Sequence, residues 1–250
     1  MEYQVIALYI HWPFCARKCP YCDFNVHVRA EIDHDLWARS YLKSLAYYKD
    51  LLPGRRLSSV FFGGGTPSLM APATVEAILR AAHDYWPFTE DCEITLEANP
   101  TSVETEKLRA FKEAGVNRVS LGVQALNDAD LQFFGRIHDL EQALGAIETA
   151  SSVFDRFSFD LMYARPRQSL KEWEVELKRA AGLAKGGHLS LYQLTIERNT
   201  PFYMAEAQGK FAMPGEDLAA DFYHLTQDVL EAAGLPAYEV SNHARPGEES

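Results

Sequence analysis

The chain has 250 residues, of which 47% are hydrophobic and 24% are charged, a composition typical of a soluble globular protein with one large domain or two small ones. Its 24 basic and 35 acidic residues give a net charge of −11, which argues against nucleic acid as the main partner because phosphate binding needs a basic surface. No apolar run approaches the ~20 residues of a transmembrane segment, and the run from residue 5 to residue 10 is too short for a signal-peptide core. We therefore predict a cytoplasmic protein with no transmembrane segment.

Short apolar runs alternate with longer helical patterns along the chain, which predicts an α/β fold with a parallel sheet. A closed barrel of this kind has eight strands, so about six βα units indicate an open, partial TIM barrel. Residues 1–200 are expected to form the core, and residues 201–250 the closing segment of the same domain. In chain order, the expected strands are Leu8–His11, Ser59–Phe62, Glu93–Ala98, Arg118–Gly122, Ser158–Met162 and His188–Thr195. The expected helices between and after them are 35–51, 73–85, 104–113, 140–151, 170–183 and 215–233.

The first functional signal is a C-x3-C-x2-C spacing, made by Cys15, Cys19 and Cys22. Thiolates are soft ligands that select iron–sulfur clusters, zinc or copper(I). Three ligands leave one coordination position open, as a ligand-binding centre requires. The alternative is a zinc site in which His11 or His27 supplies the fourth ligand. Cys92 lies far away in the sequence, beside a predicted strand, and is expected to be a packing residue.

Polar or glycine-rich residues recur at the carboxyl ends of the predicted strands, where parallel α/β folds bind their ligands. Taken alone, each has an ordinary structural explanation, such as a tight turn for glycines or a helix cap for a carboxylate. Their convergence on one end of the sheet predicts a single site. The set comprises Gly63–Thr66, Glu97, Gln124, Asp160 and Tyr192.

The ordered motifs resemble the oxygen-independent coproporphyrinogen III oxidase group of the radical S-adenosylmethionine (SAM) superfamily over nearly the whole chain. Within this group the chain is most similar to the HemW-type heme chaperones. Asp23 follows the third cysteine, where the oxidases proper carry a C-x-C step, and Tyr9 is expected to leave no room for their N-terminal extension. The motifs are the cysteine run, FGGGTPS at 62–68, TLEANP at 95–100, SLGVQ at 120–124, GRIH at 135–138, DLMY at 160–163 and YQLT at 192–195.

The resemblance implies a 4Fe-4S cluster on the three cysteines, SAM on its fourth iron, and one-electron cleavage of SAM to methionine and a 5′-deoxyadenosyl radical. It further implies heme as cargo, with heme or porphyrin, heme-accepting proteins and a reductant such as flavodoxin or ferredoxin as partners. The alternatives are SAM-dependent decarboxylation of coproporphyrinogen III and a zinc-stabilised binding module. The implied SAM contacts are Tyr9, Tyr21, Gly64, Gly65, Thr66, Glu97, Gln124, Arg136 and Asp160.

The chain departs from the family pattern in two places. The family has Gly-Leu-Pro-Gly where this chain has Ala164-Arg165-Pro166-Arg167, and the added arginines are expected to meet porphyrin propionates. The family also continues beyond the position of Ser250 into a His-Asn…Tyr-Trp segment and a small C-terminal domain, which we expect this chain to lack. A heme ligand is expected to be a histidine, and the candidates are His11, His27, His34, His83, His138, His188, His224 and His243.

Overall fold

The computed structural model describes residues 4–250 and, of residues 102 and 103, the backbone alone. Six parallel strands form one sheet in the order β1-β4-β5-β6-β7-β8, which confirms the predicted partial barrel of about six βα units. An unpredicted short strand, β9, pairs antiparallel with β8, and β2 and β3 form a separate small pair. The strands are β1 Val5–Trp12, β2 Phe14–Cys15, β3 His27–Val28, β4 Arg56–Gly64, β5 Phe88–Ala98, β6 Arg118–Gln124, β7 Arg156–Tyr163, β8 His188–Gln193 and β9 Asn242–Ala244.

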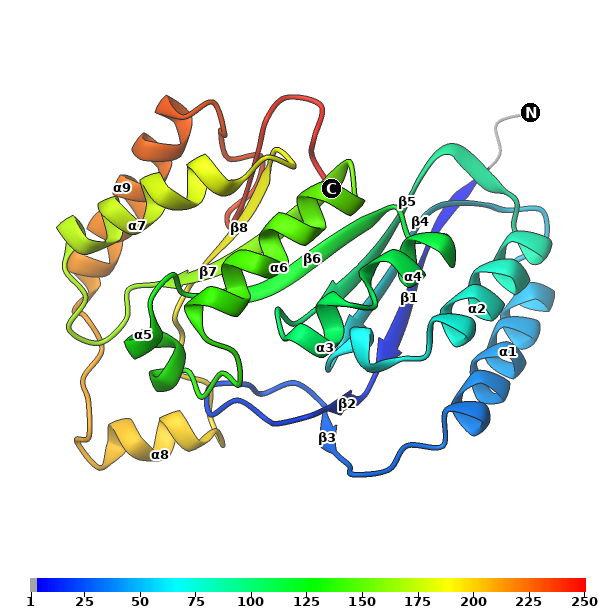
Figure 1. The fold of residues 1–250 in the computed structure, drawn as a ribbon, viewed down its shortest axis with the longest axis horizontal. Coiled ribbons are helices and arrows are strands. Elements are labelled where there is room, and N and C mark those ends of the chain that lie inside the picture. The colour runs from blue at the N-terminus through cyan, green and yellow to red at the C-terminus, as the bar shows by residue number, and fades with distance from the viewer. Residues whose placement is uncertain (1–3) are drawn as a thin grey trace.

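The helices connect successive strands and cover one face of the sheet; in Figure 1 α4 and α6 lie in front of it, α1 and α2 to its right, and α7 and α9 to its left. Helix α1 packs on α2, and α9 packs on α7. Among the described residues, no helix is both long and apolar enough to cross a membrane. The helices are α1 His34–Leu51, the 3-10 turn η1 Pro67–Leu69, α2 Pro72–Tyr85, α3 Ser102–Thr105, α4 Leu108–Glu113, α5 Asp128–Phe133, α6 Leu140–Val153, α7 Leu170–Leu183, α8 Pro201–Ala207 and α9 Glu216–Ala232.

The predicted helix 104–113 is broken into α3 and α4 by the buried side chain of Glu104. Its carboxylate accepts hydrogen bonds from the Asn99 backbone N–H at 3.0 Å and from the Thr101 hydroxyl at 3.2 Å. The Ser68 hydroxyl donates to the same carboxylate. A buried carboxylate must accept hydrogen bonds to offset its loss of water. These bonds attach the turn at α3 to the segments that follow the neighbouring strands, and a separate helix begins after it.

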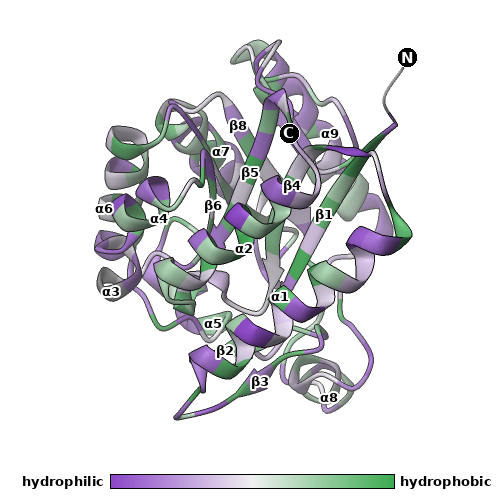
Figure 2. Cartoon of the chain, turned by 90° about the vertical axis from the view of Figure 1, so that its right-hand side faces the viewer, coloured by the Kyte–Doolittle hydropathy of each residue, from purple (hydrophilic) through white to green (hydrophobic). Residues whose placement is uncertain are grey.

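The main core lies between the sheet and the helices that cover it, and Figure 2 shows hydrophobic residues on the strands and on helix faces turned toward them. Trp12, Phe62 and Phe159 are fully buried there. A second apolar cluster lies beyond the carboxyl ends of the strands, where Phe134 and Phe202 bring α5 and α8 together. Tyr21, one of the predicted SAM contacts, packs against this cluster.

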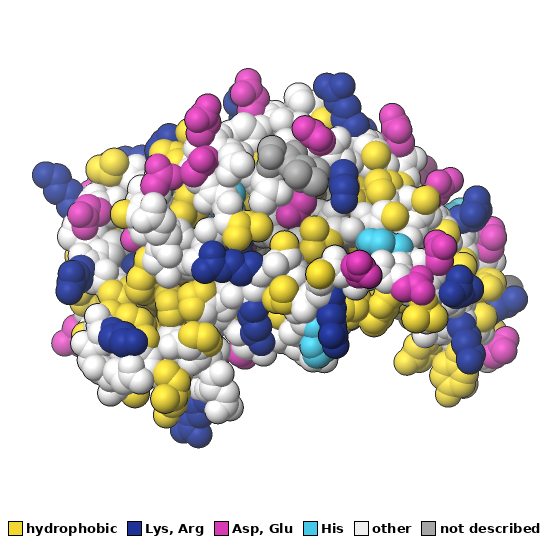
Figure 3. All heavy atoms as spheres, turned by 60° about the horizontal axis from the view of Figure 1, so that its bottom comes forward, with side chains coloured by type: hydrophobic (Ala, Val, Ile, Leu, Met, Phe, Trp, Pro, Cys, Tyr) yellow, Lys and Arg dark blue, Asp and Glu magenta, His cyan; other side chains and the backbone are white. Residues whose placement is uncertain are grey.

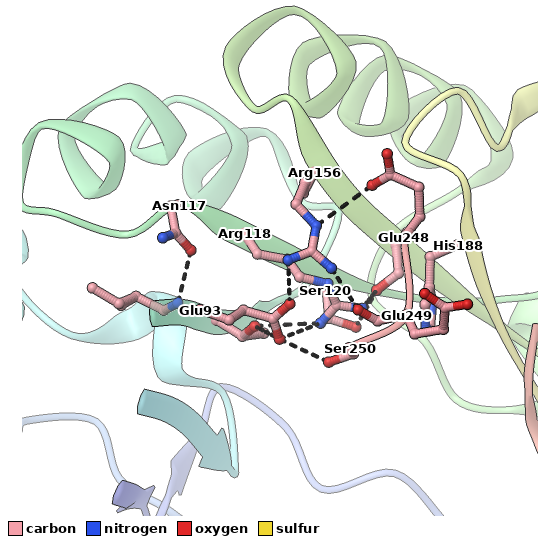
Figure 4. Close-up of polar contacts among 12 residues, drawn as sticks. Glu93, Asn117, Arg118, Ser120, Arg156, His188, Glu248, Glu249 and Ser250 are labelled. Atoms are coloured by element: carbon pink, nitrogen blue, oxygen red, sulfur yellow. Dashed lines mark hydrogen bonds and ion pairs between the residues drawn. The ribbon is translucent and has the colours of Figure 1, made fainter. Parts of the chain in front are cut away.

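The opposite end of the sheet, at the amino ends of the strands, holds a network of polar side chains (Figure 4). Arg118 is 3% exposed, and its guanidinium lies 3.8 Å from the Glu93 carboxylate and donates to the Ser158 hydroxyl at 3.0 Å. Arg156 pairs with Glu93 at 2.8 Å and with Glu248 at 3.5 Å. The segment that follows β9 is thus held against this end of the sheet by the Arg156–Glu248 ion pair and by hydrogen bonds from Arg156 to the Glu249 carbonyl and from Ser250 to Glu93.

His188 lies in the same network and is buried in its neutral form. Its Nε2 is 2.9 Å from the Tyr238 hydroxyl. Burial lowers its pKa from 6.5 to about 3, and the positive charges of Arg118 and Arg156 and the nearby His243 act in the same direction. The unfolded chain therefore takes up a proton at a higher pH than the folded protein does.

We expect acid to destabilise the protein partly through His188. The contribution of neutral His188 to the free energy of unfolding is fully present above the unfolded pKa of 6.5. It is lost as the pH falls toward the folded pKa of about 3. Between pH 7.5 and pH 5, the free energy of unfolding should fall by about 2 kcal/mol more in the wild type than in His188→Gln. Urea denaturation of both proteins at the two pH values measures this difference, and parallel falls would contradict the assignment.

Candidate functional site

The three clustered cysteines lie on the segment that begins with β2, just after β1, and all three are partly buried and outside any disulfide. Burial raises the pKa of Cys15, a hydrogen bond from Thr66 opposes this shift, and the neighbouring thiols Cys22 and Cys19 raise the pKa further. Burial and Cys19 likewise raise the pKa of Cys22. The loop thus brings together three soft sulfur ligands. Their thiolates repel one another, and iron bound between them would relieve this repulsion, so the donor set fits an iron–sulfur cluster.

The histidines proposed as a fourth zinc ligand do not complete the cysteine set. Both ring nitrogens of His11 have neighbours, with Nδ1 lying 3.3 Å from the Tyr9 hydroxyl and Nε2 lying 3.1 Å from the Asn25 carbonyl oxygen. His27 is exposed on β3. Within the described part of the chain, no three or more His, Cys, Asp or Glu side chains are arranged as a ready-made metal site.

The glycine run at the end of β4 packs directly on the backbone that leads into the cysteine loop. The Gly65 N–H donates to the Trp12 carbonyl at 2.7 Å. A Cβ atom at Gly65 would lie only 2.5 Å from the Phe14 carbonyl oxygen. Gly64 has a φ of 110°, which L side chains rarely adopt. The run therefore needs glycine for the close approach of two backbones, in addition to any ligand contact.

Two partly buried carboxylates, Glu97 on β5 and Asp160 on β7, lie at the same end of the sheet. Glu97 accepts a hydrogen bond from the Gly64 N–H at 3.2 Å, and Asp160 accepts from the Gln124 amide at 2.9 Å. Burial raises the pKa of Glu97 to about 7, helped by the charge of Asp160. Burial raises the pKa of Asp160 to about 6, opposed by Arg136. Hydroxyl or amino groups of a ligand would stabilise both carboxylates in their charged forms.

Arg136 follows α5 and links the strand ends to the cysteine loop. Its guanidinium donates to the Gly122 carbonyl at 2.8 Å and to the side-chain oxygen of Asn99. It also donates to the Cys19 sulfur at 3.3 Å and lies 3.5 Å from the Tyr21 hydroxyl. One side chain therefore contacts two strand ends and one predicted cluster ligand.

The remaining predicted SAM contacts border this group. Tyr9 is 55% exposed, and its ring stacks on Phe61. Tyr21 packs edge-on against Phe134 in the second apolar cluster. The Thr66 hydroxyl accepts a hydrogen bond from the Asn99 amide at 3.1 Å. The structure thus brings all nine predicted SAM contacts to the end of the sheet that holds the cysteines, and their contact with SAM stays a prediction.

Among the residues central to this geometry, Asn99 had no role assigned from the sequence, whereas Tyr192 belongs to the predicted strand-end set. Asn99 bridges Thr66 and Arg136. Burial raises the pKa of Tyr192 to about 12, and the nearby charge of Asp160 contributes. Asn99 directly follows β5, the strand that carries Glu97, and this position was the signal that could have identified it.

The expectation that the added arginines meet propionates is wrong for Arg165. This side chain is 3% exposed and pairs with the carboxylates of Glu176 and, at 3.2 Å, Asp130. It therefore joins α7 to α5 inside the fold. Ala164 and Arg167 have φ values of 56° and 65°, the left-handed region, at the two positions where the family pattern has glycine. Arg167 is exposed and stays a candidate.

Comparisons with known proteins agree with this geometry. The family profile described as the radical SAM superfamily matches residues 9–180. A bovine mitochondrial radical S-adenosyl methionine domain-containing protein is 43% identical over 98% of this chain and 55% of its own length. The heme chaperone HemW of Escherichia coli is 40% identical over 97% of this chain and 63% of its own length.

The solved structure of coproporphyrinogen III oxidase (HemN) from Escherichia coli, described as a radical SAM enzyme, superposes with a TM-score of 0.83 at 27% identity. It covers 99% of this chain and 57% of its own. The chain thus spans between half and two thirds of the length of these relatives. Since the family profile covers most of the chain and the fold agrees, the protein belongs to the radical SAM superfamily.

Proposed function

We propose that this chain is the cluster- and SAM-binding part of a heme chaperone, which carries heme as cargo and delivers it to acceptor proteins. The observation that carries the proposal is the gathering of three cysteines, two partly buried carboxylates and one arginine at a single end of the sheet. The 40% identity to a protein named heme chaperone HemW supports the choice of cargo.

Each group of site residues would bind a different part of SAM. Glu97 and Asp160 offer carboxylate oxygens to hydroxyl or amino groups, and the backbone at Gly64 and Gly65 admits a ligand closely because no side chain intervenes. Arg136 supplies positive charge beside the sulfur of Cys19. When bound, the cluster supplies the electron for SAM cleavage. The protein's own task is to position SAM and exclude water.

The face around the site suits an anionic, largely apolar cargo, although the whole chain carries a net charge of −11. Figure 3 shows hydrophobic side chains interspersed with basic ones across this face. The exposed basic residues on its loops make no ion pair with any described residue. Such a surface also favours an acidic reductant protein such as flavodoxin or ferredoxin. The residues are Arg17, Lys18, Arg167, Arg198 and Lys210.

Two measurements on the full-length protein test this proposal. Low-temperature EPR of anaerobically reconstituted, dithionite-reduced protein should show a 4Fe-4S signal that changes on adding SAM. Anaerobic titration with hemin, followed by absorption, should show stoichiometric binding. No cluster, or a cluster indifferent to SAM, would refute the site assignment, and absence of hemin binding would refute the cargo.

The alternative functions predict different results in the same preparation. Turnover of coproporphyrinogen III to protoporphyrinogen IX by pure protein under anaerobic conditions would establish the oxidase. Zinc without iron or sulfide on metal analysis would establish the zinc-stabilised module. The structural similarity to HemN at 27% identity makes the oxidase the stronger of these two alternatives.

A further inference from the structure

The guanidinium of Arg136 is anchored mainly by the barrel, although it reaches the cysteine loop. One terminal nitrogen donates to the Gly122 carbonyl at 2.8 Å and to Asn99, so the group is attached to the ends of β6 and β5. The other terminal nitrogen lies 3.3 Å from the sulfur of Cys19. The planar guanidinium group can serve both sides at once, because its donors lie in a fixed fork.

The backbone beside Arg136 is built to approach the cysteine loop. Gly135 has a φ of 65°, and a Cβ atom there would lie 2.8 Å from Cδ of Pro20, the residue after Cys19. On the far side of the loop, the Phe202 N–H donates to the Pro20 carbonyl at 3.0 Å. The loop at Cys19 is thus held from two sides, and the distance between the guanidinium and this sulfur is set by the fold.

We propose that Arg136 is a positioning residue for Cys19, holding this sulfur by a charge-assisted hydrogen bond that raises the reduction potential of the bound cluster. The inference rests on the proposed function only in requiring a cluster on the three cysteines. A positive charge and a hydrogen bond at a ligand sulfur stabilise the reduced cluster, which carries one more negative charge than the oxidised form. Arg136 therefore makes the cluster easier to reduce before SAM arrives.

A matched pair of variants separates this hydrogen bond from simple charge. Arg136→Gln and Arg17→Gln remove the same charge from the neighbourhood of the cluster, but Arg17 is exposed on the loop, and among the described residues it is Arg136 that donates to a cysteine sulfur. Full-length proteins are reconstituted anaerobically, and iron and sulfide are measured before the midpoint potential is determined by EPR-monitored titration without SAM. We expect a clearly more negative potential in Arg136→Gln and a much smaller change in Arg17→Gln. Equal potentials in the two variants overturn the proposal.

A second measurement does not depend on the variant retaining its cluster. Wild-type protein labelled with nitrogen-15 arginine should show a nitrogen-15 coupling to the reduced cluster in pulsed EPR. The coupling should persist in Arg17→Gln and disappear in Arg136→Lys, because the lysine variant carries no labelled nitrogen at position 136. If the wild-type protein contains the cluster but shows no nitrogen-15 coupling, the inference is overturned. If the wild-type protein takes up no iron and sulfide, the proposed function is overturned instead.

Discussion

Replacing Cys19 by serine is expected to abolish assembly of the iron–sulfur cluster, while Cys92→Ser leaves it intact. Cys19 lies on the loop with the two other ligand candidates and beside Arg136. A serine hydroxyl is a poor substitute for a soft thiolate toward iron. Cys92 is 8% exposed in β5, and burial raises its pKa to about 11, as expected for an inert packing residue.

Iron and sulfide content after anaerobic reconstitution, together with the visible absorption of the cluster, measures this difference directly. Cys92→Ser is the matched control, because it makes the same substitution at a distant site in the same chain. Equal loss of iron in both variants would contradict the ligand assignment, and so would full cluster content in Cys19→Ser.

Replacing Gly65 by alanine should weaken SAM binding by about fivefold to 150-fold, because overpacking costs roughly 1–3 kcal/mol and 1.4 kcal/mol corresponds to a factor of ten. The added Cβ would lie 2.5 Å from the Phe14 carbonyl oxygen and 2.9 Å from the Trp12 carbonyl oxygen. Both neighbours are backbone atoms and cannot rotate away, so the strand end and the loop that carries Cys15 must move apart. Calorimetric titration of SAM into the reconstituted full-length protein measures the change in affinity.

Gly145→Ala provides the control for this substitution. Gly145 lies in α6, and a Cβ atom there has no neighbour within 4 Å. Alanine in a helix interior should raise the free energy of unfolding by about 0.5–1 kcal/mol, with SAM affinity unchanged. If both variants bind SAM as the wild type does, the glycine turn plays no part in the site.

The repeat of apolar runs and helical patterns was sufficient to predict the six parallel strands and their order along the chain. Each apolar run forms one strand of the same buried sheet, so the hydrophobic pattern of the run is enough to predict a strand. The carboxyl-end rule also predicted that Glu97, Gln124 and Asp160 lie together, because connections in parallel sheets bring equivalent strand ends to one edge. The hydrogen bond between the Gln124 amide and Asp160 is the result of that placement.

Several features of the site depend on contacts between segments far apart in sequence. Glu104 breaks a predicted helix because its carboxylate is bound by Ser68, 36 residues earlier in the chain, as well as by the nearby Asn99, and no local pattern encodes the contact with Ser68. Arg165 is buried by an ion pair with Glu176, although an isolated arginine in a loop is usually exposed. Residue type alone does not say whether a charged group finds a partner.

By itself, the sequence determined the fold class, the cysteine ligand candidates and the end of the sheet at which the site lies, because these follow from periodicity and spacing along one segment at a time. Only the tertiary structure decided which groups touch. The bridge from Thr66 through Asn99 and Arg136 to Cys19 joins segments that meet only when the sheet forms. Hydrogen bonds act over a few ångströms, so their partners are set by the packing of the whole chain.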